Sequence, residues 1–193
     1  MEGDRSFAGK VFLLAGLALA CLAASCWLGW RFHQASGGYP IWLVPFGNVS
    51  PVDLHVLKDL LLQPDRTQAA VLLFWIYAGP DLIMPAVLAG LGMLLLKRFA
   101  PGGTLFRKPL TAANMRALLA VPLVYALADY AENALSLAYF CIAQPPAWIM
   151  ENAPVALPWI ASFKMAFFCI TLLLTLRFVL LRWLGVTRPE PRR

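Results

Sequence analysis

Four long apolar segments constrain this chain more than any other feature. Residues 11–30 form 20 consecutive positions without a charged side chain, and an α-helix of that length is about 30 Å long, which matches the hydrocarbon core of a bilayer. Three further segments, 67–96, 117–143 and 153–176, carry four charged residues between them. The chain is 61% hydrophobic and 13% charged, whereas a soluble domain is about 45–50% apolar and about 25% charged. This composition favours a membrane protein and excludes a disordered chain.

These segments predict an all-α, polytopic membrane protein whose four transmembrane helices form a single domain over residues 1–193. The predicted external segment between the first two spans, residues 31–66, is too long for a simple turn. Within it, Ser50, Pro51 and Asp53 are typical of a helix N-terminus, and the leucines that follow share one face. We therefore predict a short amphipathic helix at the outer membrane surface, as an interfacial connector or alternatively as a lid.

The distribution of lysine and arginine predicts the orientation. Twelve lie before the first span, between the second and third spans, or after the fourth, and three lie between the first and second. Because positively charged segments stay in the cytoplasm, both termini are predicted to be cytoplasmic, in the cytoplasmic (inner) membrane. The net charge of +6 follows mostly from this bias and does not indicate nucleic-acid binding. The twelve residues are Arg5, Lys10, Lys97, Arg98, Arg107, Lys108, Arg116, Arg177, Arg182, Arg188, Arg192 and Arg193.

The first span also has features of a secretory signal peptide. Arg5 and Lys10 precede an apolar run, and residues 18–20 are a candidate cleavage site. The apolar run continues through Trp27 and Trp30, however, and such residues are typical of the interfacial end of a membrane span. We favour an uncleaved first helix, and cleavage is the alternative.

Four charged side chains lie inside the predicted spans: Asp81, Asp129, Glu132 and Lys164. Each costs at least about 2.5–3.5 kcal/mol at the centre of a bilayer unless it faces the bundle interior and finds partners. Counted along the helices, the four positions lie at similar depths, between the midplane and the outer leaflet. We therefore predict that these side chains meet in one layer.

Polar residues follow one side of the third span at intervals of three or four, which places them on one helix face: Tyr125, Asp129, Glu132, Ser136 and Tyr139. On the second span, Gly79, Pro80 and Pro85 predict a kink or local unwinding that frees backbone carbonyls near Asp81. The predicted binding site comprises Tyr77, Asp81, Tyr125, Asp129, Glu132, Asn133, Ser136 and Lys164, with Trp159 as a further wall.

The predicted site has more acids than bases. Three carboxylates and one ammonium would give a dry site a charge of −2, so at least one carboxyl is expected to be protonated or to bind a cation. Asp129 and Glu132 are one turn apart and are expected to titrate as a coupled pair. Such a pair suits general acid–base catalysis and proton relay alike. An ion-pair network that only ties the helices together is the structural alternative.

No metal site and no cofactor are predicted. His33 and His55 lie in the external segment without a carboxylate or cysteine at ligand spacing, and the four cysteines form no C-x-x-C motif. These cysteines are expected to serve as apolar filler.

The three charged segments together resemble a group of small four-span bacterial membrane proteins. The resemblance rests on an Asp followed by a Pro in the second span (Asp81 and Pro85), on Asp-x-x-Glu-Asn in the third (Asp129, Glu132, Asn133), and on a Phe-Lys pair ending at Lys164. It covers roughly residues 70–180. The resemblance implies the four-span plan and a common site for these positions, and it implies no reaction.

Three functions fit these residues. The first is an outward-opening polar cavity that binds or transports a small amphiphile, a cation or a proton, with Asp129 and Glu132 as acceptors and Lys164 as counter-ion. The second is an intramembrane acid–base enzyme acting on a lipid-like substrate, with Asp129, Glu132, Asp81 and Lys164 as catalytic candidates. The third is a structural subunit of a membrane complex. The expected partners are membrane lipids, a lipophilic or cationic ligand, and a complex partner or a second copy of the chain.

Overall fold

The computed structural model describes residues 2–39, 50–105 and 108–185. Residues 40–49 of the predicted external segment lie outside this range. So do four of the residues that predict the orientation, namely Arg107, Arg188, Arg192 and Arg193.

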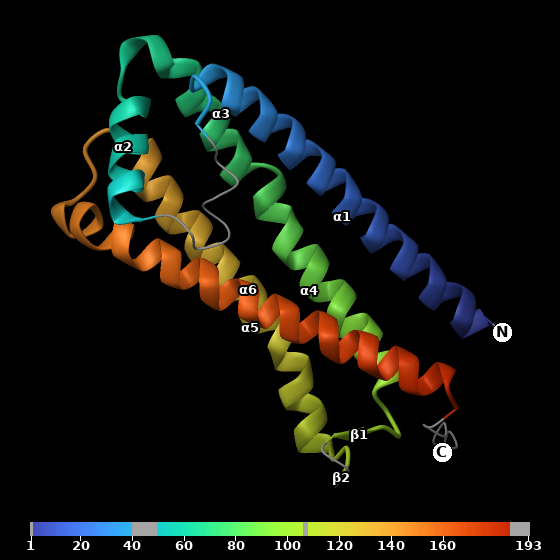
Figure 1. Ribbon diagram of the computed structural model, residues 1–193. Helices are drawn as coiled ribbons and strands as arrows, with labels where there is room; N and C mark the ends of the chain where they lie inside the picture. The colour runs from blue at the N-terminus through green and yellow to red at the C-terminus, as the bar shows by residue number, and fades with distance from the viewer. Residues whose placement is uncertain (1, 40–49, 106–107, 186–193) are drawn as a thin grey trace.

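Four helices are long and apolar enough to cross a membrane, as the sequence predicted (Figure 1). Two are unbroken and two are composite. The second combines two helices, and the third ends in a π-helical turn. In chain order they are α1 (Glu2–Ala35), α3 (Thr67–Ala78) with α4 (Pro80–Phe99), α5 (Ala112–Ser136) with the turn Leu137–Cys141, and α6 (Ala147–Trp183).

The helices extend beyond the predicted spans 11–30 and 153–176. α1 has 34 residues and α6 has 37. α1 ends just before Gly37, whose φ is +77°, and α6 runs from the residue after Pro146 almost to Gly185, whose φ is +70°. Helix ends are set by such glycines and prolines rather than by the change from apolar to polar side chains.

The second membrane-length helix is broken at Gly79, where the sequence predicted a kink. Pro80 has no N–H to donate to the carbonyl of Ile76, so the α-helical hydrogen bonding stops there. A Cβ atom at Gly79 would lie 2.6 Å from the Trp75 carbonyl oxygen, so only glycine fits this position. Gly79 therefore separates α3 from α4 and lets the chain change direction in mid-span.

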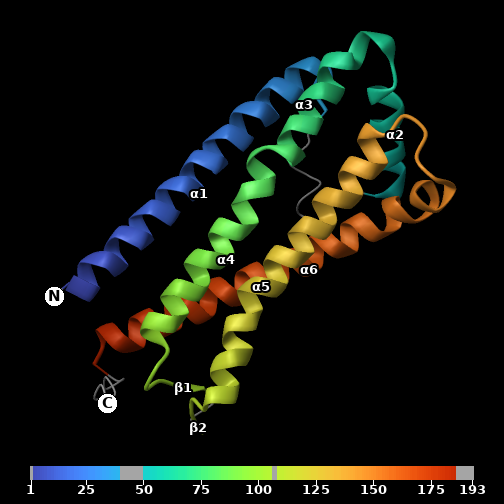
Figure 2. The same cartoon turned by 180° about the vertical axis from the view of Figure 1, so that it is seen from behind.

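The helices form one bundle in which α1 lies along α3 and α4, α4 packs on α5 and α6, and α5 crosses α6 (Figures 1 and 2). Apolar clusters occupy both ends. One joins α1, α2, α3 and α6 around Phe32, Leu57 and Leu73, and the other joins α4, α5 and α6 around Leu96, Leu118 and Phe178. The buried charged residues Asp129, Glu132 and Lys164 lie between these two clusters, whereas the buried Lys58 lies in α2 beside the first.

The short amphipathic helix predicted in the segment 31–66 is α2 (Pro51–Leu61), followed by a 3-10 turn at Pro64–Arg66. Ser50 caps it as predicted, because its side chain accepts from the Asp53 N–H while the Asp53 carboxylate accepts from the Ser50 N–H. α2 lies at one end of the bundle, and we call this the α2 end.

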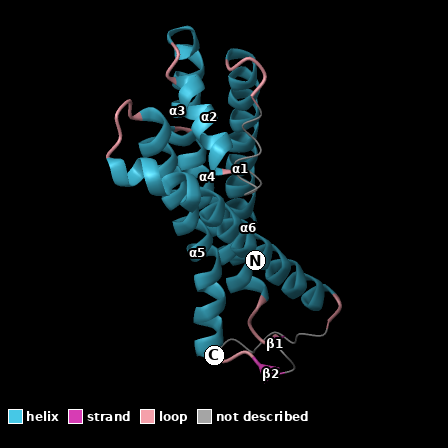
Figure 3. Ribbon diagram, turned by 60° about the vertical axis from the view of Figure 1, so that its left-hand side comes forward, coloured by secondary structure: helices cyan, strands magenta, loops and turns pink. Residues whose placement is uncertain are grey.

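A small ribbon of β1 (Thr104–Leu105) and β2 (Lys108–Pro109) lies at the opposite end, near the start of α1 and the end of α6 (Figure 3). The expectation of an all-α fold omitted this ribbon. Two residues per strand carry almost no periodic signal, and the pairing depends on the turn that joins α4 to α5. We call this the ribbon end.

Candidate functional site

The centre of the bundle holds one ammonium between two carboxylates. Lys164 of α6 places its Nζ 2.8 Å from Asp129 Oδ1 and 2.6 Å from Glu132 Oε2, and both carboxylates belong to α5. The three side chains are 10%, 11% and 3% exposed. The two acids lie three residues apart on one face of the helix, so a single lysine reaches both. We call these three residues the charged triad.

Helix crossing brings the triad together. α5 and α6 cross near the middle of the bundle (Figure 2), and the residue one turn before Lys164 is the fully packed Ala161. Small side chains let helix backbones approach closely, which keeps the lysine of α6 within contact distance of the two acids of α5. Asn133, next to Glu132, is also buried.

Asp81 lies beside the triad but binds other groups. Its Oδ1 accepts a hydrogen bond from Ser25 Oγ of α1 at 3.1 Å, and its backbone oxygen accepts one from Asn133 Nδ2 at 2.9 Å. Pro85, four residues later, has no N–H, so the Asp81 carbonyl has lost its helical donor and Asn133 replaces it. The freed carbonyl predicted near Asp81 thus has a partner on α5.

Ser25 is a site residue that the sequence analysis did not identify. It is the only hydroxyl residue in the segment 11–30, and that isolated polar position is the signal that could have revealed it. Through Ser25 the first helix contacts the acid of the second, so all four membrane-length helices contribute to this central group.

The polar stripe of α5 is buried along its length. Tyr125 packs against Phe168 with ring centroids 5.5 Å apart, and Ser136 is completely buried. Tyr77 of α3 is also buried and lies next to Ser136 and Glu132. The Ser136 and Tyr77 side chains are close enough to form a hydrogen bond.

At the α2 end the stripe meets the surface helix. Tyr139 is fully buried, and its hydroxyl lies 2.8 Å from Nδ1 of the exposed His55. Lys58 of α2 donates to the carbonyl oxygens of Tyr139 and Ile142, which closes the end of the π-helical turn. Burial lowers the pKa of Lys58, with the nearby Cys141 and Asp59 opposing the shift.

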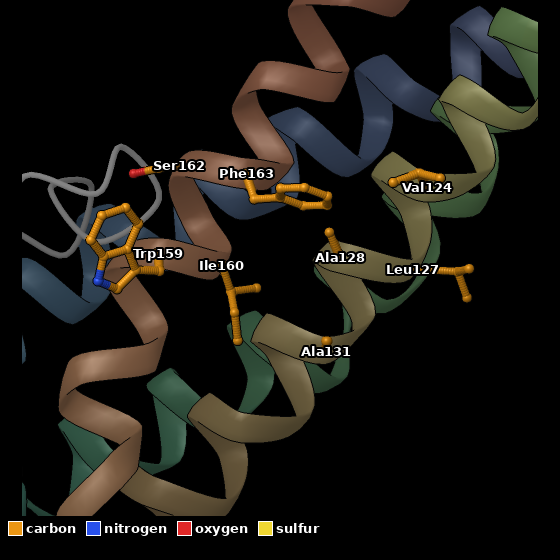
Figure 4. A pocket seen from close by; sticks show the side chains of 8 residues that line it. All are labelled: Val124, Leu127, Ala128, Ala131, Trp159, Ile160, Ser162 and Phe163. Atoms are coloured by element: carbon orange, nitrogen blue, oxygen red, sulfur yellow. The ribbon is translucent and has the colours of Figure 1, made fainter. Parts of the chain in front are cut away.

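A hollow lies on the molecule outside the charged triad. It is an apolar groove of about 750 Å³ between α5 and α6 (Figure 4). Trp159, which we expected to be a wall of the polar site, lines this groove instead. Five residues of helix separate Trp159 from Lys164, so the two side chains point about 140° apart. The groove is lined by Val124, Leu127, Ala128, Ala131, Trp159, Ile160, Ser162 and Phe163.

The described ranges contain no group of three or more His, Cys, Asp and Glu side chains placed to hold a metal ion. The chain matches no protein-family model, no curated protein and no solved structure.

The central group is chemically unbalanced. If Asp81, Asp129 and Glu132 were all ionised, Lys164 would neutralise one of three negative charges in a poorly solvated place. Such an arrangement favours uptake of a proton or of a cation. Because the acids lie close together, a proton gained by one changes the affinity of the others.

Proposed function

We propose that this chain is an integral membrane protein that takes up and releases protons at Asp129 and Glu132 and couples this exchange to the binding or transport of a cation or a cationic amphiphile. The observation that carries the proposal is the placement of Lys164 between two buried carboxylates with a third, Asp81, beside them. A purely structural tie needs one acid for each base, whereas this site has an excess of two acids.

Lys164 acts as the fixed counter-ion. It stabilises one negative charge, so the remaining carboxyls hold either protons or a positively charged ligand, and the two compete. Asp81 lies directly after the helix break at Gly79, so a change in its charge acts on a place where the backbone can reorient. Exchange between protons and cations is the property that a proton-coupled transporter requires.

The proposed location is the cytoplasmic membrane with both termini in the cytoplasm, because lysine and arginine concentrate at the ribbon end. The start of α1 and the end of α6 both lie at that end, which fits an even number of spans (Figure 1). The α2 end then faces outward.

The test uses the protein in lipid nanodiscs and infrared difference spectra between mildly alkaline and mildly acidic pH. We expect a carboxylic-acid band that grows on acidification and weakens in Asp129→Asn and in Glu132→Gln. Glu151→Gln is the matched control, because Glu151 is an exposed acid of α6. In liposomes, we expect wild-type protein to bind tetraphenylphosphonium less at acidic pH. The proposal is wrong if no carboxyl titrates or if both triad variants keep this pH-dependent binding.

The apolar groove supports a second candidate, an intramembrane acid–base enzyme acting on a lipid-like substrate. The groove lies between the two helices that carry the triad, and it is wide enough for a hydrocarbon chain. Incubation with a membrane lipid extract tests this function. A change in lipid mass that disappears in Asp129→Asn would support it, and unchanged lipid with wild-type protein would refute it.

A further inference from the structure

We infer that protons reach the charged triad from the α2 end, through His55, Tyr139 and Ser136, and that the ribbon end is closed to them. This inference rests on the proposed proton exchange and deepens it by naming the path. The carrying observation is the contact between an exposed imidazole and a completely buried phenol, which is the outermost member of the polar stripe.

The outer step is between His55 and Tyr139. The His55 side chain is exposed and has two ring nitrogens, so one can take up a proton from the external solution while the other passes a proton on. Its Nδ1 lies 2.8 Å from the Tyr139 hydroxyl, within the distance at which a proton can transfer along a hydrogen bond. As Tyr139 accepts this proton on its oxygen, it gives its own hydroxyl hydrogen to the next acceptor inward.

The inner step passes along the stripe from Tyr139 to Glu132. Ser136 lies four residues from Glu132 on one face of α5, and Tyr139 follows three residues later in the π-helical turn, so the three side chains succeed one another along the chain. The Ser136 hydroxyl is fully buried, and its hydrogen-bonding neighbour is the Tyr77 hydroxyl. Tyr77 provides a second hydroxyl there.

Where two hydroxyls are too far apart for direct contact, a water molecule carries the transfer. The transfer conserves protons at every group. The Glu132 carboxylate gains one proton and becomes a carboxylic acid, each hydroxyl gains one proton and loses one, and His55 regains its proton from the external water.

On the ribbon side of the triad, the described residues include no pair like His55 and Tyr139, in which an exposed imidazole contacts a buried hydroxyl. A Cβ atom at Gly92 of α4 would lie 2.9 Å from Thr171 Cγ2 of α6 and 3.5 Å from Pro122 Cβ of α5. The three helices are therefore in tight contact on the ribbon side of the triad. The Thr171 hydroxyl donates its hydrogen bond to the Phe167 carbonyl in the same helix. The buried Thr175 hydroxyl lies beyond this contact, among the apolar residues of the ribbon end.

Two charged side chains of α2 lie close to Tyr139, the partner of His55. Lys58 lies with its Nζ 5.1 Å from the centroid of the Tyr139 ring, and Asp59 of the same helix is close enough to act on Tyr139 electrostatically. Cys141 lies near Lys58.

The experiment follows the carboxylic-acid infrared band in nanodiscs after a rapid drop in pH. We expect His55→Ala and Tyr139→Phe to slow its appearance about tenfold or more, while its final amplitude stays at the wild-type level. Added imidazole should restore the rate in His55→Ala but not in Tyr139→Phe. Ser136→Ala should also slow the band, and because Tyr77 is hydrogen-bonded to Ser136, Tyr77→Phe is the variant that reports the loss of that bond alone.

His33→Ala is the control, because His33 lies in α1 and bonds the Tyr39 carbonyl rather than a group of the stripe. Wild-type rates in His55→Ala and Tyr139→Phe, with a band that still titrates, would overturn the path and leave the proposed function standing. A band that never titrates would instead refute the proposed function. A loss of amplitude with an unchanged rate would show that His55 has only a structural role, and it too would overturn the path.

Discussion

Replacing Lys164 with methionine tests the charged triad directly. The substitution leaves an unbranched side chain that is one atom shorter, and it removes the positive charge that lies 2.8 Å from Asp129 and 2.6 Å from Glu132. The two carboxylates are 11% and 3% exposed, so water cannot replace the ammonium. Removing one partner of a buried ion pair costs about 3–5 kcal/mol, and we expect Lys164→Met to lose that much stability at neutral pH.

The size of this loss depends on pH in a defined direction. Acidification protonates the carboxyls, which removes the unpaired negative charge from the variant and the ion pair from the wild type. The difference in stability between the two proteins should therefore shrink as the pH falls. A variant that also carries Asp129→Asn and Glu132→Gln holds no buried charge at these positions and should recover most of the lost stability.

The assay is unfolding by sodium dodecyl sulfate from a mild detergent, followed by the fluorescence of the seven tryptophans. Lys97→Met is the matched control, because Lys97 is an exposed lysine near the end of α4. If Lys164→Met is as stable as Lys97→Met at neutral pH, the triad does not form in the membrane. If the triple variant stays as unstable as Lys164→Met, the loss comes from packing and not from charge.

Two local features allow further predictions. Gly79→Ala should destabilise the protein by more than about 1 kcal/mol, because the new methyl group meets the carbonyl of the preceding turn. Gly16→Ala should be neutral or stabilising, because Gly16 faces open space on α1. Thermal unfolding of the two variants compares these effects. Hydrogen bonds from the side chain and backbone of Ser50 hold the pKa of Asp53 below its usual range, so the stability that they give α2 is present above the ordinary pKa of an aspartate and is lost as the pH falls through the lowered value. Ser50→Ala should cost α2 about 1 kcal/mol and raise the pKa of Asp53 in a carboxyl NMR titration, and an unchanged titration would contradict the cap.

Much of the fold could be read from the sequence. Long apolar segments predicted four membrane-length helices, and the N-terminal signature at Ser50 predicted α2. The break at Gly79 was also predictable, because proline lacks the N–H that an α-helix needs. Helices α1 and α6 continue past the predicted spans, because apolar residues alone define a span but do not define where a helix ends.

The site was predicted in part. Helical periodicity placed Asp129, Glu132 and Ser136 on one face, and the structure buries that face. The contact from Ser25 to Asp81 could not be predicted, because α1 is apolar on all sides and its sequence does not define which side packs. Trp159 lies at a depth that fits the polar site, but the rotation of α6 directs its side chain into the apolar groove instead.

The amino-acid sequence by itself determined the membrane-length helices, the shortage of bases against acids in their interior, and the order of polar groups along α5, since all three depend only on composition and spacing. The tertiary structure decided which acids share Lys164, that Asp81 is held from α1 and α5, and that the stripe ends at His55. The physical reason is the same in each case. Spacing defines the face of one helix, whereas a contact between helices also requires their rotation and crossing, which only packing fixes.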